Sequence, residues 1–195
     1  MSAEVYTFKV VYENCDNKIY RVFEVSSNYT LAQLGYVILA SFRTNAYHLF
    51  SIEYKGTVYE TDIEYDGASP LMREVKLSSM SLQCGEHLKM IYDFGCEQEF
   101  DIVLTDIQPM PKHRGRAYPR VIEGEGLGII DDMPADELLN IINKTDCDGK
   151  SDFKITTEFG NDIIWDYRDY RIDDDNCLLK GSIEQIQRGY EQDED

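Results

Sequence analysis

Basic side chains are scarce in this sequence. Nineteen lysines and arginines stand against 37 aspartates and glutamates, which gives a formal net charge of −18 over 195 residues. A protein that neutralises nucleic-acid phosphates or an anionic membrane needs a basic face, so nucleic acid is an unlikely partner for this chain. Long apolar runs are also lacking, because the densest stretch, 34–40, is interrupted by Gly35 and Tyr36. We therefore expect no membrane partner.

Paired cysteines are lacking as well. The five cysteines are spread singly, at positions 15, 84, 96, 147 and 177, with no CxxC pair among them. The N-terminal residues lack the basic start and apolar core of a signal peptide. Together these absences argue against a disulfide framework, and they predict reduced thiols and a cytoplasmic location.

Apolar and aromatic residues are abundant. They make up 43% and 12% of the chain, with 14 tyrosines and 8 phenylalanines, which is typical of a folded globular protein. The length suits one sizeable core. We expect a single domain over 1–195, with its core in 1–105, an elaboration in 106–195 and an acidic tail at 191–195.

The first half of the chain reads as strands around one helix. Thr30 and Gln33 form a capping box, and apolar residues at helical spacing extend that helix to about Phe42. Six segments alternate apolar and polar residues as strands do, at 7–13, 18–25, 49–54, 57–60, 87–94 and 99–105. Turn-forming residues at 14–17, 55–56 and 95–98 predict that consecutive strands pair as three hairpins. This order predicts an α+β fold with a β-grasp-like (ubiquitin-like) mixed sheet, covered by one main helix.

The second half is patterned less clearly. Prolines and glycines make residues 107–128 loop-like. A short helix is expected at 135–143, and strands at 153–159 and 163–167. A second capping box at Ser182 predicts a short last helix that ends near residue 188.

Three groups of residues resemble a known family in their order and spacing. They are Leu31-Ala32-Gln33-Leu34 with Tyr47-His48-Leu49-Phe50; Met90-Ile91-Tyr92-Asp93-Phe94-Gly95; and Tyr118-Pro119-Arg120 with Glu123-Gly124-Glu125-Gly126. This set resembles the plasmid Ri "open reading frame three"-like family, uncharacterised proteins often found on plasmids or as transposon passengers. The resemblance covers roughly residues 5–145. It supports the fold and implies no activity, because none is established for the family.

Two departures from the family pattern concern polar positions. After Tyr-Asp-Phe-Gly the family usually carries two acids, a tryptophan and a histidine, where this chain has Cys96, Glu97, Gln98 and Phe100. Further on, the family's Pro-Pro-Glu-Asp is replaced by Ile129-Ile130-Asp131-Asp132, which keeps the acids and loses the prolines. The resemblance implies that any polar site there is partly altered in this chain.

Four acids form the best chemical candidate. Asp93, Glu97, Asp131 and Asp132 are able to converge at a strand end and hold Mg²⁺ or Mn²⁺, which prefer oxygen ligands. The alternative is a solvated rim, in which Asp131 and Asp132 favour the N-terminus of the following helix.

A basic segment runs against the overall charge. Lys112, Arg114, Arg116 and Arg120 lie within nine residues with no acid among them. They are interpreted either as a solvated loop or as a docking site for an anionic ligand or partner.

No complete catalytic constellation is present, and we predict no catalytic residue and no cofactor, with Mg²⁺ or Mn²⁺ as the alternative. With its many tyrosines, the sequence favours a non-enzymatic module that binds a protein partner. The alternative is a divalent-metal-dependent enzyme acting on a phosphate ester or another small anion. In that alternative the acid set holds the metal and the basic segment holds the substrate.

Overall fold

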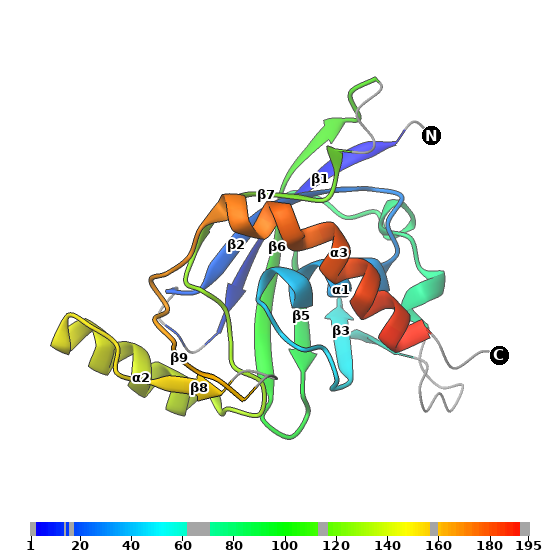
Figure 1. Cartoon of the computed structure of the whole chain (residues 1–195). Helices are drawn as coiled ribbons and strands as arrows, with labels where there is room; N and C mark the ends of the chain where they lie inside the picture. Colours follow the sequence, from blue (N-terminus) through cyan, green and yellow to red (C-terminus); the bar gives the residue numbers. More distant parts are fainter. Residues whose placement is uncertain are drawn as a thin grey trace.

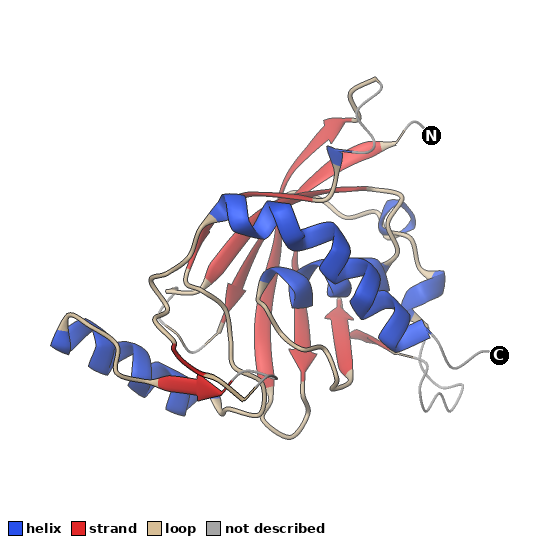
Figure 2. Ribbon diagram, in the orientation of Figure 1, coloured by secondary structure: helices blue, strands red, loops and turns tan. Residues whose placement is uncertain are grey.

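A seven-stranded antiparallel sheet forms the centre of the protein in the computed structural model, which describes residues 3–13, 15, 18–61, 71–112, 117–156 and 160–191. The strand order is β4-β3-β5-β6-β1-β2-β7. The strands are β1 (Glu4–Tyr12), β2 (Tyr20–Ser26), β3 (Phe50–Tyr54), β4 (Thr57–Glu60), β5 (His87–Tyr92), β6 (Gln98–Pro109) and β7 (Arg120–Glu125). Figures 1 and 2 show α1 (Leu31–Ser41) and α3 (Ile172–Glu191) on the same face of this sheet.

The hairpins predicted from alternation are confirmed. β1 pairs with β2, β3 with β4, and β5 with β6, each antiparallel and joined by a short connection. Alternate side chains are buried in β2, in β5 and in the first half of β6; in β2, Phe23 and Val25 are fully buried between more exposed neighbours. Strand period and turn residues were therefore sufficient to define these pairs.

The prediction of a mixed sheet is wrong, because all six neighbouring strand pairs are antiparallel. β6 is twelve residues long and lies between β5 and β1, pairing with both. The β-grasp-like detail is therefore not confirmed. What the structure shows is an α+β fold built on a large antiparallel sheet with three helices.

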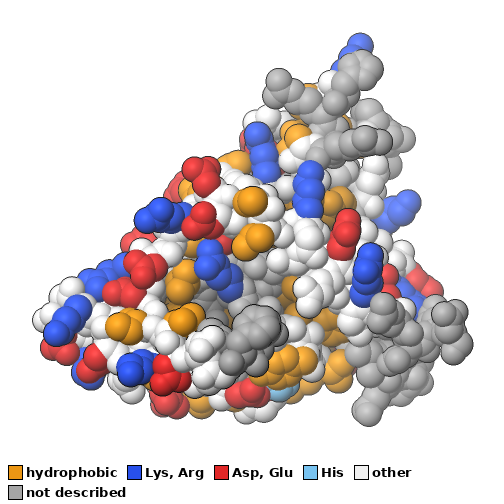
Figure 3. Space-filling view, viewed as in Figure 1, with side chains coloured by type: hydrophobic (Ala, Val, Ile, Leu, Met, Phe, Trp, Pro, Cys, Tyr) orange, Lys and Arg blue, Asp and Glu red, His pale blue; other side chains and the backbone are white. Residues whose placement is uncertain are grey.

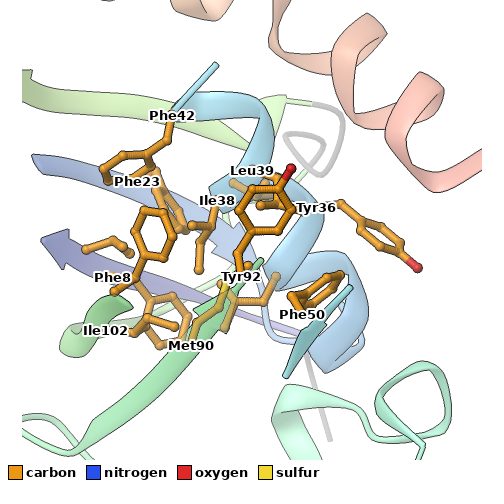
Figure 4. Close-up of a cluster of buried hydrophobic side chains, with 14 of the residues drawn as sticks. Phe8, Phe23, Tyr36, Ile38, Leu39, Phe42, Phe50, Met90, Tyr92 and Ile102 are labelled. Carbon is orange, nitrogen blue, oxygen red and sulfur yellow. The ribbon is translucent and has the colours of Figure 1, made fainter. Parts of the chain in front are cut away.

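Helix α1 (Leu31–Ser41) covers the middle of the sheet. Its predicted capping box is present: the Gln33 amide donates to Thr30 Oγ1 at 3.2 Å, and the Thr30 amide donates to Gln33 Oε1 at 3.0 Å. Nine of its eleven residues are buried. In Figure 4 Ile38 and Leu39 lie among aromatic and aliphatic side chains of the strands, which form the core.

Helix α3 (Ile172–Glu191) corrects the short last helix expected at 182–188. It begins ten residues before Ser182, and its buried side chains include Leu179, Ile183 and Ile186. α3 contacts both α1 and β7, and Figure 1 shows it crossing in front of α1. Burial of one apolar face along twenty residues explains why the helix continues through Gly181 and Ser182.

Strand β7 corrects the loop expected at 107–128, as does the extension of β6 to Pro109. β7 lies at the edge of the sheet and pairs with β2. The side chain of Asn176 in α3 binds this strand: Oδ1 accepts from the Val121 amide, and Nδ2 donates to the Val121 carbonyl, both at 2.8 Å. Pairing on one side and an amide side chain on the other therefore hold β7 in place.

A smaller unit follows the main sheet. Helix α2 (Ala135–Asp148) confirms the expected helix and extends it by five residues. β8 (Lys154–Thr156) and β9 (Asp162–Ile164) form a two-stranded hairpin, shorter than the strands expected there, and residues 157–159 lie outside the described part. Figure 1 places this unit to one side of the sheet.

Charges are mixed on the face seen in Figure 3, where lysine and arginine side chains alternate with aspartate and glutamate. The net charge of −18 is therefore not concentrated in one patch on that face. None of the described helices is long and apolar enough to span a membrane.

Glu86 gives a pH-dependent prediction. Its carboxylate accepts from Lys55 Nζ at 2.5 Å, from Tyr54 Oη at 2.6 Å and from the Gln83 amide at 2.9 Å. These bonds, that of Lys55 first, lower the pKa of Glu86 to about 2. The stabilisation is present above the ordinary glutamate pKa and is lost as the pH falls toward about 2.

We therefore expect the stability difference between wild type and Glu86→Gln to shrink between pH 6 and pH 2. Urea denaturation at several pH values measures this difference. A constant difference across that range would contradict the assignment.

Candidate functional site

Three connections meet beside the ends of β3 and β5. The loop from α1 to β3 carries His48, the turn from β5 to β6 carries Asp93, and the turn before α2 carries Asp132. The Asp93 amide donates to the Leu49 carbonyl at 3.0 Å, which fixes the first two connections side by side.

His48, Asp93 and Asp132 form a compact cluster of possible metal ligands, here called the His48 centre. His48 Nε2 lies 2.9 Å from Asp132 Oδ1 and 3.7 Å from Asp93 Oδ2. One ligand atom from each residue lies within 4.8 Å of the other two, and no other group of three such residues does so in the described part of the chain. Metal–ligand bonds of roughly 2.0–2.2 Å place the ligand atoms of one ion about 3–4 Å apart, so small shifts of these side chains suffice.

Asp93 presents an unpartnered oxygen to this centre. The residue is only 6% exposed. Its Oδ1 accepts from the Gly95 and Cys96 amides at 3.1 and 3.4 Å, whereas its buried Oδ2 has no hydrogen-bond partner among the described residues. A buried carboxylate oxygen without a donor costs free energy, so this atom calls for a ligand.

Asp132 is oriented in a similar way. Tyr47 Oη donates to its Oδ2 at 2.7 Å, which leaves Oδ1 toward His48. The bond from Tyr47, followed by that from His48, lowers the pKa of Asp132, and the same bond to Asp132 raises the pKa of Tyr47 to about 12. Each carboxylate thus has one oxygen held by the protein and the other turned toward the centre, the arrangement by which outer groups orient metal ligands.

Asp131 supports the centre from outside. Its Oδ2 accepts from the Asn45 amide and its Oδ1 from Tyr92 Oη, both at 2.7 Å. Burial, and then this bond to Asp131, raises the pKa of Tyr92, so the tyrosine stays a donor. Asp131 therefore ties the His48 loop to the end of β5, and both of its oxygens are occupied.

Gln98 fixes the turn that carries Asp132. It is fully buried, its Oε1 accepts from Tyr12 Oη, and its Nε2 donates to the Met133 carbonyl at 2.6 Å. This position is one of the departures from the family pattern noted in the sequence. Here it joins the start of β6 to the residue that follows Asp132.

The structure brings together two of the four acids proposed from the sequence. Asp93 and Asp132 meet at the centre, and Asp131 lies behind them. Glu97 is exposed and lines an open groove beside the same turns, and is not one of the three clustered ligands. That groove is lined by Cys96, Glu97, Glu99, Pro134, Ala135, Asp136 and Leu139.

His48 was not identified as a candidate ligand from the sequence. It appeared only as part of a family motif, and it lies 45 residues before Asp93 with no spacing that links them. The available signal was a histidine next to a strand whose partner strand ends in an aspartate. That signal requires the pairing of β3 with β5, where Phe50 lies opposite Tyr92.

The basic residues singled out in the sequence lie away from the His48 centre where the structure describes them. Arg120 Nε binds Glu24 Oε2 at 2.6 Å at the start of β7, Lys112 is exposed after β6, and Arg114 and Arg116 lie outside the described residues. The pairing of β7 with β2, of β2 with β1 and of β1 with β6 places Arg120 level with Asp106 of β6. Asp106 is eight residues along β6 from Gln98, which lies at the end of the sheet near the His48 centre. At about 3.3 Å per residue, Arg120 is therefore roughly 25 Å from the His48 centre along the strand direction.

The family-motif positions also divide between two places. Tyr92, Asp93, Phe94 and Gly95 form the end of β5 and the turn of the His48 centre. Tyr118, Pro119, Arg120 and Gly124 lead into and build β7, where the bond between Tyr118 and Pro119 is cis. A Cβ on Gly124 would lie 2.9 Å from both Arg21 Cδ and Tyr170 Oη, which explains the glycine there.

Comparison with known proteins gives a family match and a similar solved structure. A family described as "Plasmid pRiA4b ORF-3-like protein" matches residues 4–171. A crystal structure of a protein of unknown function, MM3350 from Methanosarcina mazei Go1, is similar with a TM-score of 0.70 and 20% identity, over 89% of this chain and 97% of that one. No curated protein matches significantly. At this identity the likeness shows the fold alone.

Proposed function

Because the chain belongs to the plasmid pRiA4b ORF-3-like family, an uncharacterised family, we propose a function from its geometry: it binds a divalent transition-metal ion at the His48 centre. Half-buried His48, buried Asp93 and exposed Asp132 supply three ligands and leave the remaining positions of the ion open to solvent or to a small ligand. Such an open coordination sphere is typical of metal sites that act on a bound molecule.

The observation that carries the proposal is Asp93 Oδ2, a buried carboxylate oxygen with no hydrogen-bond partner among the described residues. The alternative is that His48 alone pairs with both carboxylates, but its Nε2 lies 2.9 Å from Asp132 Oδ1 and 3.7 Å from Asp93 Oδ2, too far for a hydrogen bond. An ion placed between the three groups satisfies all of them at once.

The ligand set favours particular metals. Carboxylates alone suit Mg²⁺ or Mn²⁺, the ions expected from the acid set, whereas an imidazole shifts preference toward Zn²⁺, Fe²⁺ or Ni²⁺, with Mn²⁺ still acceptable. A phosphate ester remains a possible substrate class. The position of Arg120 does not support the basic set as its clamp.

Metal binding is tested by melting chelator-treated protein with Zn²⁺, Mn²⁺, Ni²⁺, Mg²⁺ or Ca²⁺. An ion at a hundred times its dissociation constant adds about 2.7 kcal/mol to the folded state. For a chain of this length that raises the melting temperature by about 5–10 °C. We expect this rise with Zn²⁺ or Mn²⁺, its reversal by chelator, and little effect of Ca²⁺.

Matched variants locate the ion. Asp93→Asn and Asp132→Asn are expected to abolish the rise, and Asp136→Asn, an exposed acid in the first turn of α2, is expected to keep it. If no metal raises the melting temperature, or if Asp93→Asn retains the full rise, the metal proposal is wrong.

A protein-interaction module is the second candidate, favoured by the aromatic side chains around the centre. Tyr47 is 59% exposed and Phe94 52% exposed, and each is adjacent in sequence to a residue of the cluster. Exposed rings beside a carboxylate suit a lysine or arginine side chain from a partner. An arginine-containing peptide that raises the melting temperature through Asp93 in the presence of chelator would favour this candidate over the metal.

A further inference from the structure

Helix α3 holds the loop that carries His48 at both ends. At the start of the loop, Asp175 Oδ1 accepts from Arg43 Nε and Nη2 at 3.3 and 3.2 Å. At its end, Tyr190 Oη donates to the backbone carbonyl of His48 itself. Asp175 and Tyr190 are fifteen residues apart, about 22 Å along the helix, so one rigid element spans the loop.

The ring of Tyr190 is held firmly enough to act as a support. It stacks on Tyr36 with 5.5 Å between ring centroids, and it lies perpendicular to the ring of Phe50 with 5.3 Å between centroids. The side chain is 7% exposed. Burial, with a smaller contribution from the charge of Asp131, raises its pKa, so the hydroxyl remains a donor.

α3 also lies beyond the residues shared with the family pattern, which matches up to residue 171, whereas the helix begins at Ile172. The groups that donate hydrogen bonds to Asp93 and Asp132 belong to residues 47, 95 and 96, which lie inside the span matched by the family. His48 is thus the ligand whose placement depends on a segment outside it.

We infer that Tyr190 is a positioning residue for His48; this inference rests on the proposed metal function. Metal binding then stabilises the C-terminal half of α3, and that half of the helix stabilises the bound metal. An ion that fixes His48 fixes the acceptor of the Tyr190 bond. By thermodynamic linkage, the bound ion strengthens the hydrogen bond from Tyr190 by a certain factor. Loss of that hydrogen bond lowers the affinity for the ion by the same factor. Removal of groups that orient metal ligands costs about 10- to 100-fold in affinity.

The experiment titrates Zn²⁺ calorimetrically into wild type, Tyr190→Phe and Tyr167→Phe, with Asp132→Asn reporting any binding away from the centre. Phenylalanine keeps the ring contacts and removes only the hydroxyl. Tyr167 is a matched control, because it too is 7% exposed and donates its hydroxyl to a distant acceptor, Asp146 Oδ1, at 2.5 Å. We expect Tyr190→Phe to raise the dissociation constant about tenfold and Tyr167→Phe to leave it unchanged.

Hydrogen exchange on the wild type supplies a second measurement that needs no variant. Zn²⁺ is expected to slow amide exchange in residues 183–191, whereas a purely structural role for Tyr190 predicts no change there. Wild-type binding with unchanged affinity in Tyr190→Phe, or unchanged exchange in α3, overturns this inference alone. A wild type that binds no Zn²⁺ at the centre overturns the metal proposal and this inference together.

Discussion

Replacing Asp175 with asparagine is expected to lower the free energy of unfolding by about 3–5 kcal/mol, because it leaves the buried charge of Arg21 without its counter-ion. Arg21 is fully buried, and its Nε lies 3.2 Å from Asp175 Oδ2. Burial lowers the pKa of Arg21, although the guanidinium stays charged.

The surroundings of Arg21 show why this loss is not easily absorbed. Its guanidinium donates to four backbone carbonyls, those of Tyr20, Ser41, Glu125 and Leu127. It also lies 3.8 Å from the ring centre of Tyr170. The carbonyls accept hydrogen bonds from the guanidinium but do not neutralise its net charge, so the carboxylate has no substitute.

Urea denaturation of wild type, Asp175→Asn and Asp174→Asn measures the effect. Asp174 is the exposed neighbour in the first turn of α3 and provides the control for charge near a helix N-terminus, worth under about 1 kcal/mol. Equal losses in the two variants would show that Asp175 acts only through the helix dipole.

Replacing Gly128 with alanine is expected to cost about 3 kcal/mol or more, since it combines a steric clash with backbone strain. Gly128 has φ +142°, and a Cβ built on it would lie 2.3 Å from the carbonyl oxygen of Phe42. That oxygen accepts from the Ile129 amide at 3.1 Å, so it cannot move away without breaking a bond.

Gly149→Ala separates the two causes in the same denaturation experiment. Gly149 follows α2 with φ +68°, and a Cβ there meets no atom within 4 Å. Only the strain of about 1 kcal/mol applies to it. If both alanine variants lose the same stability, the contact with Phe42 is not responsible.

The fold was predictable where local pattern and final structure agree. Alternation and turn residues defined three hairpins, and the Thr30 capping box defined the start of α1. β7 and α3 were not predictable in this way. Gly124 and Gly126 disfavour a strand, which forms because β2 and Asn176 supply partners. The capping sequence at Ser182 predicts a helix start there, but tertiary packing extends the helix beyond the predicted residues in both directions.

The candidate site was half predictable for a related reason. Carboxylates in turns that follow strands can be read from sequence, and two of the four acids do meet. Their partner His48 follows a helix and joins them only because β3 lies next to β5 and α3 holds the loop. Such a constellation depends on contacts between distant segments, which neither spacing nor composition contains.

The two hydrogen bonds between Asn176 and Val121 have a consequence for the behaviour of the protein in concentrated solution. An open sheet exposes unsatisfied amides and carbonyls along its outermost strands, where another molecule can attach by adding a strand. At β7 the Asn176 side chain makes the two hydrogen bonds to Val121 that one residue of an added strand would make, and so occupies that position. The opposite edge is β4, only four residues long. A helix side chain at one edge and a short strand at the other thus leave little of the sheet open to the addition of a strand from a second molecule.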